Sequence, residues 1–146
     1  MSSTPQPGSI VLLIKLTRRV YRQATEDVLG LKLKAYMVLT NLREGALPQQ
    51  DLCASMQMDA NNTVLLLNDL ESKGFVERRR DPADRRRHIV AITGAGHEAL
   101  THAERAMGEL EAEAFSGLSA EDRAALRDLL FRAVEADELA DQAEAA

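Results

Sequence analysis

The sequence predicts a mainly α-helical fold with one small β-hairpin, and three observations support this prediction. Apolar residues recur at the three- and four-residue spacing of amphipathic helices over most of the chain. Aromatic residues make up only 3%, so the core must consist of Leu, Ala, Val and Met, a composition that favours helices. Residues 75–92 alternate as two strands around a turn. We expect six helices, with the hairpin between the fourth and the fifth.

Length and composition limit the possible architectures. The 146 residues, of which 45% are hydrophobic, suffice for one domain or for a small domain with helical extensions. The single cysteine excludes an intramolecular disulfide, which suits a reducing cytosol, so we expect a cytoplasmic protein. Residues 1–9 are polar and interrupted by proline, which indicates a flexible lead rather than a signal peptide. No apolar run approaches the ~20 residues of a membrane span.

The first half of the chain is expected to contain three helices. Residues 10–29 form the first, which Gly30 ends. Its apolar stripe is so wide that we expect it to pack on two sides, and a second chain is one candidate partner. Residues 33–43 form the second helix. Pro48 suits the first turn of a short third helix that ends near Met56, because proline lacks the N–H that this position would leave unpaired.

The fourth helix is predicted to begin after Asp59, whose carboxylate can accept the free N–H of Asn62. It runs to Lys73, and Gly74 closes it. Its apolar stripe leaves a second face outward, formed by Ala60, Asn61, Val64, Leu65 and Asn68. Two short helices joined by a tight turn, the second with a polar start, are typical of a helix-turn-helix.

A basic hairpin follows this helix directly. Its predicted strands are Phe75–Arg79 and His88–Ile92, and Asp81-Pro82 begins the turn. Six arginines but only three acids lie between Glu77 and Arg87, although the net charge of the chain is −5. We interpret this concentration of positive charge as the wing of a winged helix-turn-helix.

Two further helices are expected after the hairpin. Thr93 caps the fifth, in which Leu100 to Ala114 follow coiled-coil spacing. Ser119 and Asp122 form a capping box for the sixth. The last dozen residues hold five acids and no base, and this Ala-, Glu- and Asp-rich end is expected to fray.

These features together resemble the MarR family of winged helix-turn-helix transcriptional regulators, over about residues 10–140. The resemblance is carried by residues 74–78 (GFVER), 81–86 (DPADRR) and 93–96 (TGAG). It implies a homodimer in which the first, fifth and sixth helices interlock, with the fourth helix in the major groove of double-stranded DNA. It also implies that Arg86 is the wing arginine and that Asp84 braces it. Val64, Leu65 and Asp69 depart from the family, which often has Thr, Arg and a basic residue at these positions.

The resemblance assigns each part of the chain a role. We expect a flexible lead (1–9), a dimerisation region (10–30 and 97–140), a winged helix-turn-helix lobe that binds DNA (31–96) and an acidic tail (141–146). The implied function is a ligand-released repressor that binds a pseudo-palindromic operator. The alternative is a winged-helix module that binds DNA without an effector or docks protein.

The wing arginines have a physical reason to contact DNA. A guanidinium on a turn can enter a narrow minor groove, which we expect of Arg85, Arg86 and Arg87. Arg78, Arg79 and Arg80 would instead lie along the strand toward phosphates. The alternative is a solvated hairpin with local Asp–Arg pairs, and the position directly behind a helix-turn-helix favours DNA binding.

The fourth helix offers side chains that can contact bases. Asn61 or Asn62 can bond adenine N6 and N7, while Val64 and Leu65 can touch thymine methyl groups. Asn68 lies on the same outward face. Alternatively, one of the two adjacent asparagines caps the helix or binds phosphate. Gln49, at the start of the third helix, is a candidate phosphate contact, as is its neighbour Gln50.

Other chemistry finds little support in the sequence. Cys53 has no nearby basic residue that would activate its thiol, so we interpret it as a small, half-buried residue. His97 and His102 lie on different helix faces, and Glu98 with His102 gives too few ligands for zinc. No nucleophile–base pattern or phosphate-binding glycine loop is present. We therefore expect no metal, no cofactor and no enzymatic activity.

An effector pocket is expected where the first helix meets the winged lobe. Its candidate residues are Arg18, Tyr21, Tyr36 and Met37. An arginine with a tyrosine suits a small aromatic or phenolic acid, through a charge-assisted hydrogen bond and ring stacking. Alternatively, Arg18 forms an ion pair between subunits and the tyrosines belong to the core.

Overall fold

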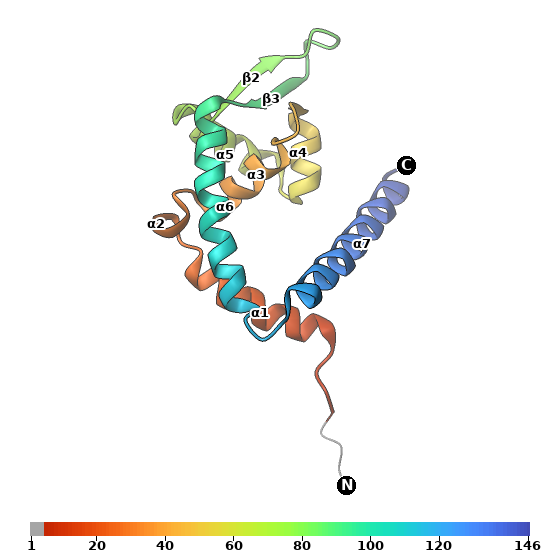
Figure 1. Ribbon diagram of the computed structural model, residues 1–146. Helices are drawn as coiled ribbons and strands as arrows, with labels where there is room; N and C mark the ends of the chain where they lie inside the picture. Colours follow the sequence, from red (N-terminus) through yellow and green to blue (C-terminus); the bar gives the residue numbers. More distant parts are fainter. Residues whose placement is uncertain (1–4) are drawn as a thin grey trace. The chain divides into compact units, whose positions relative to one another are not determined.

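The computed structural model describes residues 5–146, so the predicted flexible lead (1–9) lies partly outside the described residues. The chain divides into two compact units: the first ends at Leu110 and the second runs from Glu111 to Ala146. The described residues form seven helices and three strands (Figure 1). In chain order they are α1 (Ser9–Gln23), α2 (Glu26–Leu29), α3 (Leu33–Asn41), β1 (Leu47–Pro48), α4 (Gln49–Met56), α5 (Ala60–Ser72), β2 (Val76–Arg80), β3 (His88–Ile92), α6 (Gly94–Ala114) and α7 (Ala120–Ala145). The predicted mainly helical fold with a small hairpin is confirmed.

The predicted first helix is two helices, and the prediction of six helices was therefore wrong. α1 ends at Gln23, where the N–H of Ala24 donates to the carbonyl of Val20 at 2.7 Å. α2 then runs for one turn and ends at Gly30, whose φ of +74° is left-handed. α1 itself has no buried residue, whereas Ala24 and Leu29 are buried. The bend thus lets the chain enter the core after an exposed helix.

The helix-turn-helix consists of α4 and α5, joined by a tight turn in which Gln57 has a φ of +50°. Asp59 caps α5 as predicted, because its Oδ1 accepts the N–H of Asn62 at 2.8 Å. Pro48 does not lie in the first turn of a helix. It precedes α4 and belongs to β1, where its fixed φ suits extended backbone.

The strands form an antiparallel sheet in the order β1-β3-β2. β2 and β3 are the predicted hairpin, in a register that pairs Arg78 with Val90 and Arg80 with His88. β1 was not predicted, because two residues are too few to show a strand period. It pairs Leu47 with Val90 and closes the sheet on the side opposite β2.

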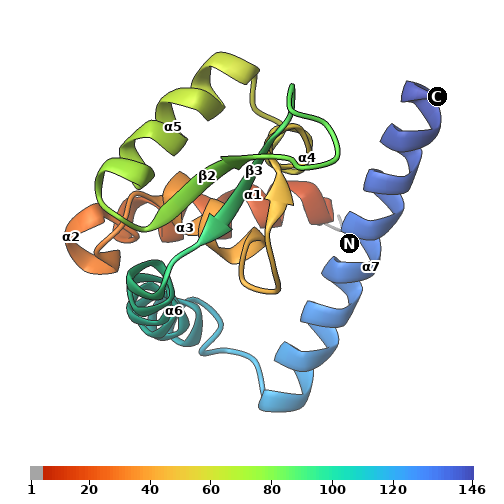
Figure 2. The same ribbon diagram turned by 90° about the horizontal axis from the view of Figure 1, so that it is seen from above.

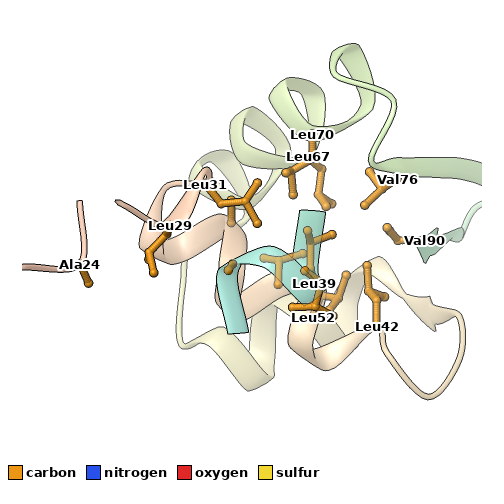
Figure 3. Packing of buried hydrophobic residues seen from close by; sticks show 14 residues of the cluster. Ala24, Leu29, Leu31, Leu39, Leu42, Leu52, Leu67, Leu70, Val76 and Val90 are labelled. Atoms are coloured by element: carbon orange, nitrogen blue, oxygen red, sulfur yellow. The ribbon is translucent and has the colours of Figure 1, made fainter. Parts of the chain in front are cut away.

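The core lies between the helices of the lobe and the base of the sheet. Figure 3 shows leucines of α4 and α5 converging with Val76 of β2 and Val90 of β3. Leu67 and Leu70 of α5 are almost completely buried, and α6 adds Leu100. Since burying a leucine stabilises a fold by roughly 1.5–3 kcal/mol, these contacts hold the inner face of α5 firmly and leave its other face free.

A hydrogen-bonded joint connects the end of α5 to the start of α6. The Thr93 hydroxyl donates to the carbonyl of Gly74 and accepts the N–H of Gly96 at 3.0 Å, so the predicted cap is confirmed. Gly74 has a φ of +76°. A Cβ on Gly96 would lie 2.1 Å from the carbonyl oxygen of Phe75. The two backbones therefore touch here.

The second unit contains α7. Ser119 caps this helix, with its Oγ accepting the N–H of Asp122 at 3.1 Å. The helix continues through the acidic end to Ala145, and the expected fraying of this end stays a prediction. Ala and Glu are strong helix formers, which explains why the low-complexity end stays helical. No helix in residues 5–146 is long and apolar enough to cross a membrane.

Candidate nucleic-acid interface

The outward face of α5 carries an uncharged line of residues, and the exposed Glu71 lies beside its end. Thr63, Leu67 and Leu70 point into the lobe, while Asn61, Leu65 and Asn68 are exposed, as predicted. Residues spaced by four and three positions lie in one line along a helix. Leu65, in the middle of the line, is 66% exposed, and Val64 lies beside it at 37%. This line combines apolar groups with amides, the groups that can contact base edges.

The two adjacent asparagines have different environments. Asn62 belongs to the cap, because its Nδ2 donates to Asp59 Oδ2 at 2.7 Å and its backbone N–H donates to the same carboxylate. Asn61 is exposed, and no hydrogen bond of its side chain is recorded among residues 5–146. Of the two, Asn61 is therefore the one with a free amide.

The wing tip has an ordered turn around Asp84. Its Oδ1 accepts the backbone N–H of Arg86 at 3.1 Å and the guanidinium Nε of Arg86 at 3.3 Å. The Arg86 side chain is nevertheless 92% exposed. The N–H of Asp81 donates to the carbonyl of Arg87 at 2.9 Å and closes the turn. The geometry of a braced, projecting arginine, expected from the resemblance, is present.

The other wing arginines differ in accessibility. Arg85 is exposed at the tip, and its carbonyl accepts Arg80 Nη1 at 2.9 Å. Arg87 is half-buried, and its Nε has no hydrogen-bond partner among the described residues. Arg85 and Arg86 therefore project, whereas Arg80 and Arg87 lie along the body of the hairpin.

Comparison with known proteins agrees with a helix-turn-helix that is followed by a basic hairpin. The model of the MarR family matches residues 29–87. An uncharacterized HTH-type transcriptional regulator of Bacillus subtilis, YdgJ, is 30% identical over 119 residues, which cover 75% of this chain and 73% of the relative. The chain belongs to the MarR family. It is thus a transcriptional regulator with a DNA-binding fold, not an enzyme.

Several solved structures, MarR among them, have the same fold. A crystal structure of MarR superposes with a TM-score of 0.79 at 25% identity, over 94% of this chain and 95% of that one. A probable transcriptional regulator from Pseudomonas aeruginosa gives 0.71 at 28%, over 85% and 95%. A mutant of Escherichia coli MarR, complexed with operator DNA, gives 0.69 at 25%, over 84% and 90%. BpsR of Bordetella bronchiseptica, whose DNA binding is regulated by 6-hydroxynicotinic acid, gives 0.72 at 23%, over 90% and 98%.

Arg78 occupies a different place from the one predicted for it in this MarR-family regulator. β2 runs back alongside α5 (Figure 2), and Arg78 is half-buried between them. Its Nε donates to Glu71 Oε2 at 2.9 Å, and its Nη2 donates to Asn68 Oδ1 at 2.5 Å. The hydrogen bond and the charge of Arg78 lower the pKa of the Glu71 carboxyl. The charge of Arg78 is therefore balanced within the lobe.

Glu71 was missed by the sequence analysis. Asn68 and Glu71 are three residues apart and share a face of α5, so both meet the strand that returns along this face. The sequence does contain a signal for this contact: Glu71 follows the outward amide of Asn68 by one helical turn, and Arg78 lies on the next strand. This signal is hard to recognise in the sequence, because Arg78 belongs to a hairpin whose six arginines form one basic cluster.

Gln49 is less available than predicted. The residue is half-buried at the start of α4, and its Oε1 is buried without a hydrogen-bond partner among the described residues. Its neighbour Gln50 is exposed. Of the two, Gln50 has the accessible amide.

A pocket of about 450 Å³ lies inside the first unit. Tyr21 and Met37 line it as predicted, but Arg18 and Tyr36 are not among its lining residues. The remaining lining residues are Ala24, Lys32, Leu33, Lys34, Met56, Met58 and Leu66. Leu66 belongs to α5, so one wall of the pocket is the inner side of the helix whose outer side carries Leu65.

Proposed function

We propose that this MarR-family regulator is a homodimeric repressor that inserts α5 into the major groove and its wing into the minor groove of a pseudo-palindromic operator. One observation carries the proposal above all: the uncharged outward line of α5 lies in the same lobe as a wing whose arginine projects and is braced. Half-sites are expected about one helical turn, ~10 bp, apart.

The two elements have separate tasks. Asn61, Val64 and Leu65 contact bases, and the absence of a cation on this line means that α5 contributes little electrostatic attraction. The exposed wing arginines, Arg85 and Arg86, supply that attraction and enter the minor groove. Arg80 and Arg87 remain candidate phosphate contacts along the hairpin.

Dimerisation is supported by apolar surface on the terminal helices. α1 exposes Ile10, Val11, Leu12 and Ile14, and α7 exposes Leu129, Phe131, Val134 and Leu139. Each helix, considered by itself, presents more large apolar side chains than isolated surface positions explain. A second copy of the chain covers them in a closed, symmetric dimer.

The pocket supports release by a small aromatic acid. Lys32 and Lys34 supply positive charge for a carboxylate, and Tyr21 offers a ring for stacking. Methionines adapt their shape to a flat ligand. Because Leu66 of α5 forms one wall, a ligand that prefers a displaced α5 lowers DNA affinity by shifting the population of states. The regulation of BpsR by 6-hydroxynicotinic acid is a precedent within this fold.

Arg86→Ala tests the DNA-binding part. Fluorescence anisotropy measures the affinity of wild type and variant for the DNA upstream of the gene and for random DNA, at several salt concentrations. We expect wild type to prefer the upstream DNA and its log K to fall linearly with log salt concentration. Arg86→Ala is expected to weaken specific binding about tenfold, within the roughly 1–3 kcal/mol typical of such contacts.

Arg43→Ala is the matched control, because it removes the same charge from an exposed site that follows α3 and belongs neither to the wing nor to the helices expected at the dimer interface. It should change the affinity by less than about twofold, as expected of a charge away from the contact surface. Equal binding of upstream and random DNA by wild type contradicts the repressor proposal. Unchanged DNA affinity across a panel of aromatic acids contradicts ligand release and favours a regulator that acts without an effector.

A further inference from the structure

We propose that Asn68 presents its amide donor to DNA and thereby favours guanine over adenine and cytosine, because Arg78 holds its amide oxygen. The inference rests on the proposed insertion of α5 into the major groove. It assigns a specificity-determining role to Asn68 and a positioning role to Arg78, with Glu71 holding Arg78 in place.

The orientation of the Asn68 amide follows from chemistry. A guanidinium has only N–H donors, so the group that meets Arg78 Nη2 must be the amide oxygen and not the amide nitrogen. The opposite orientation would bring two donors into contact. Nδ2 therefore points away from Arg78, and no hydrogen bond of this nitrogen is recorded among residues 5–146.

Arg78 itself is held in position. Its Nε is bound to Glu71 at 2.9 Å, and the side chain of Arg78 is only 19% exposed, whereas that of Arg86 is 92% exposed. Glu71 lies one turn after Asn68 on α5. The guanidinium of Arg78 thus bonds two side chains of the same helix. Because Asn68 is already restrained in the free protein, its side chain loses less conformational entropy when DNA binds.

The position of Asn68 directs the free donor outward. Asn61, Leu65 and Asn68 follow one another at four- and three-residue spacing on the exposed face of α5. If Leu65 touches the groove floor, Asn68 lies one turn further along the same line. Its neighbours on this line are apolar or amide groups and not cations, which suits base edges better than phosphates.

A donor alone distinguishes bases by their major-groove groups. In the major groove guanine shows two acceptors, N7 and O6, and thymine shows one, O4. Adenine shows the acceptor N7 beside an amino donor, and cytosine shows an amino donor only. An unrestrained asparagine recognises adenine by accepting from N6 and donating to N7. Because the Asn68 oxygen is bound to Arg78, it cannot turn to accept from adenine N6 while Nδ2 donates to N7. Asn68 therefore loses the usual preference of asparagine for adenine, favours guanine with its two acceptors, and disfavours cytosine, which has none.

Selection of binding sites from random DNA tests this inference with the full-length protein. Wild type should enrich a motif in which one position per half-site prefers guanine. Asn68→Ala should abolish the preference at that position, from about tenfold to near none, and leave the other positions unchanged. Asn68→Asp keeps the acceptor for Arg78 but lacks the donor, so it should lose the same preference.

Arg78→Met separates positioning from structure. It leaves the amide in place but free to rotate, so adenine should become tolerated at the same position while the rest of the motif persists. A merely structural role of Arg78 would lower affinity at all positions alike. Thermal melting shows whether each variant folds. If Arg78→Met does not fold, Asn68→Ala and Asn68→Asp still test whether Asn68 reads a base.

The contrary outcomes are distinct. If wild type enriches no motif, the proposed function fails and this inference fails with it. If a motif appears but Asn68→Ala leaves it unchanged, Asn68 reads no base and only this inference fails. A wild-type preference for adenine or cytosine at the affected position overturns the donor-only assignment. An unchanged profile for Arg78→Met overturns the positioning role.

Discussion

At the scale of single residues, the stability of the lobe depends on a few close backbone contacts, hydrogen bonds and ion pairs. Gly96 lies where α6 begins, directly against the carbonyl of Phe75, and the hydroxyl of Thr93 joins the same place to Gly74. This joint fixes the end of α5 relative to the start of β2. Small changes here therefore act on α5 and on the wing at once.

Gly96→Ala is expected to destabilise the fold by about 1–3 kcal/mol or more, the cost of forcing an atom into a packed site. The added Cβ would lie 2.1 Å from a backbone oxygen, which cannot move away as a side-chain tip can. Gly94→Ala is the control, because nothing lies within 4 Å of its Cβ position. Thermal unfolding should show a lower Tm for the first variant only. Equal Tm values would mean that the joint is loose.

Glu71 makes stability depend on pH. Its carboxyl pKa is lowered from the ordinary value of 4.5, chiefly by the hydrogen bond from Arg78. A lowered pKa means that the ionised form stabilises the folded state. This contribution is complete above the unfolded pKa and is lost as pH falls through the folded pKa.

Urea unfolding of wild type and Glu71→Gln from neutral to acidic pH measures the effect. The difference in the free energy of unfolding should be constant at neutral pH and should shrink below about pH 4.5, the ordinary value. Since Glu71 is exposed, the difference should also decrease in high salt. A difference that is the same at every pH would show that the ion pair adds no stability.

At the scale of elements, α5 depends on its cap as well as on its buried leucines. Asp59→Ala removes the acceptor of the Asn62 N–H and should lower the free energy of unfolding by about 1 kcal/mol. Asp59→Asn is the matched control, because asparagine caps a helix about as well. Chemical denaturation followed by circular dichroism compares the two. A loss of equal size in both variants would assign the effect to charge and not to capping.

Elements specified by local signals were predictable. The cap at Asp59, the hairpin around Asp81 and the outward face of α5 all follow from residues a few positions apart. Features that depend on distant contacts were not predictable. The break at Ala24 exists because that residue must reach the core, and β1 exists only as a partner of β3.

The candidate site divides in the same way. The pair of Asp84 and Arg86 is local, and its geometry was anticipated from the motif. The contact of Arg78 with Asn68 spans ten residues and requires the strand to return along α5, so sequence alone suggested a phosphate contact for Arg78. The pocket likewise joins α1, α3, α4 and α5, which explains why its lysines were missed and Arg18 was chosen instead.

At the scale of the whole molecule, the apolar surface of α1 is not covered by the rest of the first unit. The helix has no buried residue, and Ile14 is 45% exposed. We expect the wild type to be a dimer in sedimentation equilibrium. Ile14→Glu should raise the dimer dissociation constant by about tenfold or more, because a charge would be desolvated at a packed interface.

Thr40→Glu adds the same charge to an exposed site on α3, outside the terminal helices, and should leave the dimer intact. If wild type is monomeric at all concentrations, a dimeric operator complex is excluded. If both variants remain dimeric, the interface lies elsewhere than on α1. Because two half-sites are bound together, dissociation should also lower operator affinity far more than it lowers binding to a single half-site.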